Sequence, residues 1–245
     1  MGNDFRNKLK IIGSEEDVRK IKDVFINEKG EVDFNKVIPV PDCLLINSSG
    51  IISSPSPEDE FVAHYILSLP HGEREGIFIR LRSISCSNYK NYFEKFSRTI
   101  KEMDAISFLN LEKYSERFFG GMSYPEIGKK YLFNMLMYGS LTCYEWCYRN
   151  WGTSWNAFET RANGNEITFS TSNSGAAPVV HRIARMFPDV TIEYGCGDTC
   201  NPGRFCEYYA FSGEEISEYR IYGNHSEDGA EFIRSFMGFR FNRWD

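Results

Sequence analysis

The spacing of apolar residues divides the chain into a helix-rich first part and a strand-rich second part. A short strand is predicted over 8–12, and a capped helix follows Ser14, with apolar residues three and four positions apart. Pro39 and Pro41 exclude a regular helix from the next segment. Residues 57–149 then show mainly helical spacing. The chain is therefore expected to open with a strand and a helix and to continue as a largely helical region.

The strongest helix signal begins at Ser123. Glu126, three residues later, completes a capping box, and Pro125 lies in the first turn, where its missing N–H does little harm. The pattern predicts one long helix that stops at Gly152. Further helical spacing is present over 89–103.

Beyond Gly152, short runs rich in aromatic and β-branched residues are typical of strands. An Asn-Gly-Asn sequence at 163–165 separates the first two runs and suits a hairpin turn. Helices are predicted over 178–187 and about 227–237, and three further strands lie between them. These elements predict an α+β fold in which an antiparallel sheet is covered by two helices.

Composition narrows the class of protein. The 245 residues are 42% hydrophobic and 25% charged, which provides enough apolar material for a packed core and gives no sign of disorder. A formal net charge of -6 disfavours electrostatic binding to nucleic-acid phosphates over a broad surface. No apolar run is long enough for a signal peptide or a membrane span. We therefore expect a cytoplasmic protein without a membrane partner.

Seven cysteines form an odd set, which in a reducing compartment predicts buried thiols rather than disulfides. Cys196, Cys200 and Cys206 crowd one strand–loop–strand turn and are the candidate zinc ligands. Structural zinc sites favour two paired C-x2–4-C knuckles, and no histidine supports these three cysteines. We expect no metal and no cofactor.

The stretch CYEWCYRNWGTSWNAFET holds three of the four tryptophans. It lies where the long helix is predicted to pass into the first sheet strand. Trp151 and Trp155 are expected to pack at this junction, with Gly152 allowing the backbone to turn between them. Thr153 and Asn156 are expected to satisfy local backbone groups at the turn. These five residues form the predicted structural motif.

The Trp-Gly-Thr-x-Trp-Asn-Ala core of this stretch also carries a family resemblance. Together with VDFNKVIPVP at 32–41, FSTSNSGAAPVV at 169–180 and MFPDVTIEYGCG at 186–197, it resembles the YubB-type ferredoxin-like family of plasmid and phage proteins. The resemblance implies a ferredoxin-like α/β sandwich near the C-terminus, an antiparallel sheet with helices on one face. The change from helix-rich to strand-rich spacing places this domain at 145–245, after a region over 1–144 that opens with a strand and a helix and is then mainly helical. The resemblance implies no iron–sulfur cluster.

The resemblance implies a mobile-element setting and no established reaction. No G-x-S-x-G elbow, Walker loop or dinucleotide fingerprint occurs, and the four histidines lack metal-ligand spacing. Aromatic-rich segments without such signatures favour a non-enzymatic protein that binds another protein. We expect a phage or plasmid protein in a bacterial cell. Its partner would be a host protein, such as an anti-phage defence complex that it inhibits. A homo-oligomer is compatible with this hypothesis.

Two alternatives stay open. One is a nucleic-acid-binding ferredoxin-like module that uses Arg182 and Arg185, on the polar side of their helix, with Arg240 and Arg243 among C-terminal aromatic residues. Such arginines and aromatic rings can hold phosphates and stack bases, although the acidic balance opposes nucleic acid. The other is a cryptic enzyme with a Cys-His pair brought together by the fold.

Overall fold

The computed structural model describes residues 4–46, 57–83, 118–119, 121–198, 206–223 and 226–238. The chain divides into two compact units. The sheet unit combines residues 1–40 with 147–245, and the helical unit comprises 41–146. This division differs from the expected one at 144/145, because the N-terminal residues belong with the C-terminal sheet.

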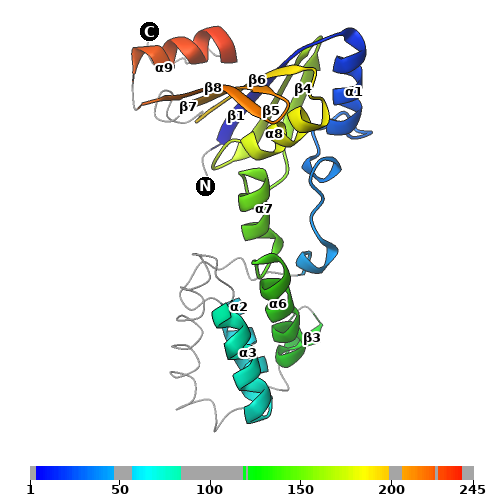
Figure 1. The fold of residues 1–245 in the computed structure, drawn as a ribbon, viewed down its shortest axis with the longest axis vertical. Helices are drawn as coiled ribbons and strands as arrows, with labels where there is room; N and C mark the ends of the chain where they lie inside the picture. The colour runs from blue at the N-terminus through cyan, green and yellow to red at the C-terminus, as the bar shows by residue number, and fades with distance from the viewer. Residues whose placement is uncertain are drawn as a thin grey trace. The chain divides into compact units, whose positions relative to one another are not determined.

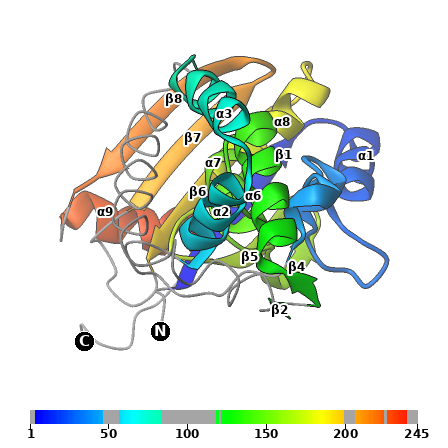
Figure 2. The same ribbon diagram turned by 90° about the horizontal axis from the view of Figure 1, so that it is seen from below.

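The sheet unit is built on a six-stranded antiparallel sheet in an α+β fold. Its strands are β1 (Asp4–Ile12), β4 (Phe158–Asn163), β5 (Glu166–Ser172), β6 (Thr191–Asp198), β7 (Cys206–Ser212) and β8 (Glu215–Tyr222). Their order is β4-β5-β1-β6-β7-β8, and each neighbouring pair is antiparallel. Figure 2 shows the strands in this order, with β4 and β8 at the edges. The N-terminal strand thus lies inside the sheet, between strands from much later in the chain.

Helices cover both faces of this sheet. The core face is covered by α1 (Glu15–Phe25), the 3-10 turn η1 (Phe34–Lys36) and α8 (Ala177–Met186). On the other face lie α9 (Glu227–Phe232) and the π-helical turn η3 (Ile233–Met237), opposite α8 (Figure 1). Gly195 makes room there for the rings of Phe232 and Phe236, since a Cβ at Gly195 would lie 2.7 Å from Phe232. The expectation of helices on one face only is therefore wrong.

Alternation along β1 separates the two faces. Phe5, Asn7, Leu9 and Ile11 point to the core face and are buried, as the two-residue period of a strand requires. Aromatic rings fill the space above them. Phe169 lies with its ring centre 5.6 Å from that of Phe25 and 5.8 Å from that of Phe34.

The helical unit has its own core. Its elements are η2 (Asp42–Leu44), α2 (Pro57–Ser68), α3 (His71–Ser83), the paired β2 (Phe118–Phe119) and β3 (Met122–Ser123), and α6 (Tyr124–Tyr138). The backbones of α2 and α6 approach closely at Gly128, where a Cβ would lie only 1.9 Å from the Phe61 carbonyl oxygen. Phe61 also stacks on Tyr131, with 6.1 Å between ring centres. Small size at one position thus brings the two helices together.

The long helix expected from Ser123 to Gly152 is divided in two. The capping box is present, since the Ser123 N–H donates to Glu126 Oε2 at 2.9 Å. However, α6 ends before Gly139, which takes a left-handed φ of 68°. A second helix, α7 (Cys143–Trp151), follows and ends at Gly152, where φ is 85°. The predicted stop at Gly152 is confirmed, and the uninterrupted helix is wrong.

Other local predictions agree with the structure. The helix after Ser14, the hairpin at 163–165 and the helix at 178–187 correspond to α1, β4–β5 and α8. The predicted helix at 227–237 is α9 followed by η3. The predicted helical spacing over 89–103 lies outside the described residues.

Candidate functional site

The Trp151–Asn156 turn is fixed on one side by the segment that follows α1. Trp151 donates from Nε1 to the Ile38 carbonyl oxygen at 2.9 Å, and its ring centre lies 5.4 Å from that of Phe34. The Asn156 Oδ1 accepts from the Phe34 N–H at 2.9 Å, and its Nδ2 donates to Asp33 Oδ1 at 2.8 Å. Segments more than a hundred residues apart in the sequence therefore hold each other in place.

The same turn is fixed on its other side by the end of β5 and the residues that follow it. Thr153 donates from Oγ1 to the Ser172 carbonyl oxygen at 2.8 Å, and the Ser174 hydroxyl donates to the Gly152 carbonyl oxygen. Gly152 must be glycine on two grounds. Its φ is 85°, and a Cβ would lie 2.5 Å from the Gly175 carbonyl oxygen. The turn is consequently clamped between two neighbouring segments.

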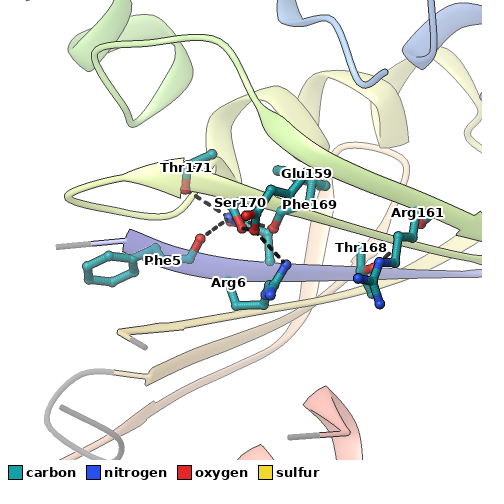
Figure 3. A network of polar contacts seen from close by, with 9 residues as sticks. Phe5, Arg6, Glu159, Arg161, Thr168, Phe169, Ser170 and Thr171 are labelled. Atoms are coloured by element: carbon teal, nitrogen blue, oxygen red, sulfur yellow. Dashed lines mark hydrogen bonds and ion pairs between the residues drawn. The ribbon is translucent and has the colours of Figure 1, made fainter. Parts of the chain in front are cut away.

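A buried polar network lies beneath the residues that follow β5. Asn7 Nδ2 donates to Thr171 Oγ1 at 2.8 Å and also reaches the backbone oxygens of Phe5 and Phe169. Figure 3 labels these three partners. Asn7 Oδ1 accepts from the Tyr194 hydroxyl at 2.6 Å. The same hydroxyl accepts from the Ala176 N–H at 2.6 Å. Since Asn7 and Tyr194 are buried, these hydrogen bonds offset the cost of removing their polar groups from water.

The five motif residues have different environments. Trp151 is buried, with 2% of its surface exposed. Asn156 accepts from the neighbouring Ala157 N–H, the local contact expected of it, whereas Thr153 bonds to the carbonyl oxygen of Ser172, 19 residues away. Trp155 is 59% exposed, so the prediction that it packs inside is wrong. The reason is that the small side chains of Thr153 and Ser154 take the buried positions after Gly152. The turn therefore presents Trp155 to solvent.

The opposite face of the sheet carries charges that neutralise each other. Arg6, Lys8 and Lys10 alternate along β1 and point away from the core face. Arg6 pairs with Glu159 at 3.2 Å, which also accepts from the Ser170 hydroxyl (Figure 3). In addition, Lys8 pairs with Glu166 at 2.9 Å and Lys10 pairs with Glu193 at 3.4 Å. These three cations already have carboxylate partners, which makes this face a poor match for phosphate.

The predicted arginine set is only partly described. Arg182 and Arg185 lie on α8, above the core face, and Arg185 is 3.8 Å from a carboxylate oxygen of Glu214. Arg240 and Arg243 lie outside the described residues.

The candidate zinc ligands do not converge in the described part of the chain. Cys196 faces the core side, where its Sγ is 3.9 Å from Glu207 Oε2. Cys206 packs against Phe232 on the opposite face. Cys200 lies outside the described residues. Within the described ranges, no group of three or more His, Cys, Asp or Glu side chains is arranged to hold a metal.

We predict that Cys196 resists alkylation in the folded protein. Burial, together with the nearby Glu207 carboxylate, raises the pKa of Cys196 to about 12, so the reactive thiolate is scarce at pH 8. Peptide mapping after a short pulse of iodoacetamide should find Cys196 unlabelled and the half-buried Cys43 labelled. Unfolding in guanidinium should expose both. Rapid native labelling of Cys196 would contradict its placement beneath Gly175.

Sequence reasoning missed two parts of this site. Asn7 lies just before the strand predicted over 8–12 and within β1 as observed, and nothing local marks its contact with Tyr194. Gly175 belongs to the turn after β5, where a Cβ would lie 2.3 Å from the Cys196 sulfur. The sequence signals there are Asn173 and Gly175 themselves, since Asn173 takes a left-handed φ of 68°.

Comparisons with known proteins add little to this geometry. No protein-family model and no curated protein matches the chain. A solved structure of the protein api92 from Yersinia pseudotuberculosis, of the family DUF1281, is similar with a TM-score of 0.41 and 10% sequence identity. The match covers 92% of this chain and 100% of that one. A similarity of this size carries no argument about fold or function. In the part of the chain that the structure describes, no helix has the length and apolar content to cross a membrane.

Proposed function

We propose that this chain is a non-enzymatic binding protein that recognises another protein through the surface around Trp155. The observation that carries the proposal is the exposure of this large ring, at 59%, on a turn held from both sides. Tryptophan is enriched among residues that dominate binding energy at protein interfaces. A ring presented in this way offers a large apolar contact area to a partner.

The clamped backbone supports this proposal energetically. Binding costs less when the contact residue is already ordered, because less conformational entropy is lost. Asn156, the residue after Trp155, is hydrogen-bonded to Phe34 of η1, and Thr153 is hydrogen-bonded to the end of β5. Tyr148 adds a second exposed ring from the last turns of α7, with 56% of its surface accessible. A large exposed ring such as Trp155 suits a protein surface better than a small molecule.

We further propose a ferredoxin-like core and membership of the YubB-type family. Support comes from the order of six elements, β1-α1-β4-β5-α8-β6, which form a βαββαβ unit. Its four strands have the spatial order β6-β1-β5-β4, and β7 and β8 extend the sheet beyond β6. On this proposal the chain is a phage or plasmid protein, and its partner is a host protein in an anti-phage defence complex.

Nucleic-acid binding is the less favoured function. The cations of β1 are paired with carboxylates, and the chain has a net charge of -6. A protein partner requires no such excess of positive charge.

The Trp155→Ala variant separates a binding role from a structural one. We expect its melting temperature to stay within about 2 °C of wild type, because substitutions at exposed positions usually change stability by less than about 0.5 kcal/mol. Capture of a stoichiometric partner from a phage- or plasmid-bearing host should fall at least about tenfold, as for loss of a hot-spot residue. Met186→Ala, at an exposed site on α8, is the control and should retain capture. Equal capture by wild type and Trp155→Ala would refute this surface.

A further inference from the structure

The second half of the edge strand β8 is regular and open to pairing. Among the described residues, β8 pairs with β7 alone. Proteins usually protect such edges with bulges or charges. The other edge follows this rule, since β4 has a register shift between Phe158 and Arg161 and Glu159 takes a φ of 52°. On β8 the register shift lies near the start of the strand, opposite Ala210 and Phe211, and Glu218–Tyr222 pair regularly with Cys206–Ala210. In this regular part Tyr219 is 48% exposed and Ile221 is 58% exposed.

Two residues of opposite charge flank Tyr219 on β8. These residues, Glu218 and Arg220, both point to the α9 face, because they are opposite Ala210 and Tyr208 of β7. Within one chain these two side chains form an ion pair. The sequence Glu-Tyr-Arg is therefore complementary to itself when read antiparallel.

We propose that a second copy of this chain pairs with β8 in antiparallel orientation, with Tyr219 opposite Tyr219 of the second copy. This register places Glu218 opposite Arg220 of the second copy, and the reverse pair follows by symmetry. Opposite charges in such positions stabilise a strand pair, whereas like charges destabilise it. The two sheets then join into one continuous sheet across the two-fold axis.

Charge selects this register over its neighbours. Residues directly opposite each other must point to the same face of the sheet. A two-fold axis perpendicular to the sheet therefore lies midway between one residue and the same residue of the second copy. An axis at Arg220 would place the two copies of Arg220 opposite each other, and an axis at Glu218 would place the two copies of Glu218 opposite each other. The axis at Tyr219 avoids both conflicts.

The ring at the axis is already held in position. Tyr219 packs on Tyr209 with 4.6 Å between ring centres, and its hydroxyl donates to Glu207 Oε1 at 3.2 Å. Tyr209 in turn stacks on Phe211, with 5.4 Å between ring centres. This row of rings on the core face of β7 and β8 continues into the second copy in the proposed dimer. Little side-chain entropy is lost on association, which favours pairing.

Sedimentation of the full chain from about 1 to 100 µM tests the dimer, since a strand-pair interface lies at the small end of specific interfaces. Wild type should approach twice 28.4 kDa across this range. Arg220→Glu should raise the dimer Kd about tenfold or more, because it opposes two glutamates at two symmetric positions. The double swap Glu218→Arg with Arg220→Glu should restore wild-type affinity. Arg161→Glu, the same charge change on β4, is the matched control and should have no effect.

A disulfide cross-link tests the proposed register directly. In Tyr219→Cys the two introduced thiols would face each other across the axis, within reach of a disulfide. Mild oxidation should give a covalent dimer through Cys at position 219, whereas Ile221→Cys should give little. A wild-type monomer throughout the concentration range overturns the proposal. So does a dimer that is indifferent to Arg220→Glu and gives no cross-link at 219.

Discussion

Replacing Trp151 by alanine should destabilise the sheet unit by about 3–5 kcal/mol, the usual cost of removing a buried large aromatic side chain. Only 2% of Trp151 is exposed, and its ring packs on Phe34 while Nε1 bonds to the Ile38 carbonyl oxygen. The alanine variant loses the ring and leaves that oxygen without its donor. Guanidinium unfolding followed by circular dichroism measures the loss.

Trp151→Phe is the informative control. It keeps an aromatic ring against Phe34 but removes the Nε1 donor to Ile38, so a smaller loss of about 1–2 kcal/mol is expected. If alanine and phenylalanine variants both unfold at the wild-type midpoint, the segment over 32–38 is not held by Trp151.

Gly175→Ala should cost about 3 kcal/mol or more, and the variant is expected to accumulate poorly. The added Cβ would lie 2.3 Å from Cys196 Sγ and 2.7 Å from the Tyr194 hydroxyl. Tyr194 has little freedom to move, because its hydroxyl is bonded to Asn7 and Ala176. Overpacking a filled core typically costs about 1–3 kcal/mol, and breaking a buried hydrogen-bond network adds to this.

Gly223→Ala provides the matched comparison for thermal unfolding. A Cβ at Gly223 would meet no atom within 4 Å, so its melting temperature should stay close to wild type. Neither glycine has a left-handed φ, which means that the difference between the variants reports steric contact alone. Similar melting temperatures for both would show that Gly175 does not lie against Cys196.

Local signals in the sequence were sufficient for several elements. The helix cap at Ser14 and the capping box at Ser123 depend on nearby residues alone, and both are present in the structure. The hairpin at 163–165 likewise follows from the residues of its turn. Gly139 shows the limit of such signals. Apolar spacing continues across it, yet the backbone changes to a left-handed conformation and ends α6.

Non-local pairing decided what the sequence left open. The position of β1 between β5 and β6 depends on contacts with residues near 170 and 195, which no local pattern encodes. The same holds for α9, whose face is set by the absence of a side chain at Gly195.

The sequence identified the turn residues of the candidate site, but it did not predict which of their side chains face inward. The Trp-Gly-Thr-x-Trp-Asn-Ala sequence marked the correct turn, where Trp151 is buried and Gly152 takes a left-handed φ. Asn156 makes the expected local bond to Ala157, but its bonds to Phe34 and Asp33 were not predicted. Trp155 differs because hydrophobicity alone does not determine which of two nearby tryptophans faces inward. That choice follows from Thr153 and Ser154, whose small side chains fit the buried positions.

Photo-crosslinking from position 155 in the bacterial host tests the binding surface most directly. A benzoylphenylalanine residue at 155 should give, on irradiation, one protein adduct of defined mass, and the same residue at 186 should give none. Adducts at both positions, at neither, or to nucleic acid in place of protein would contradict a protein-binding surface centred on Trp155.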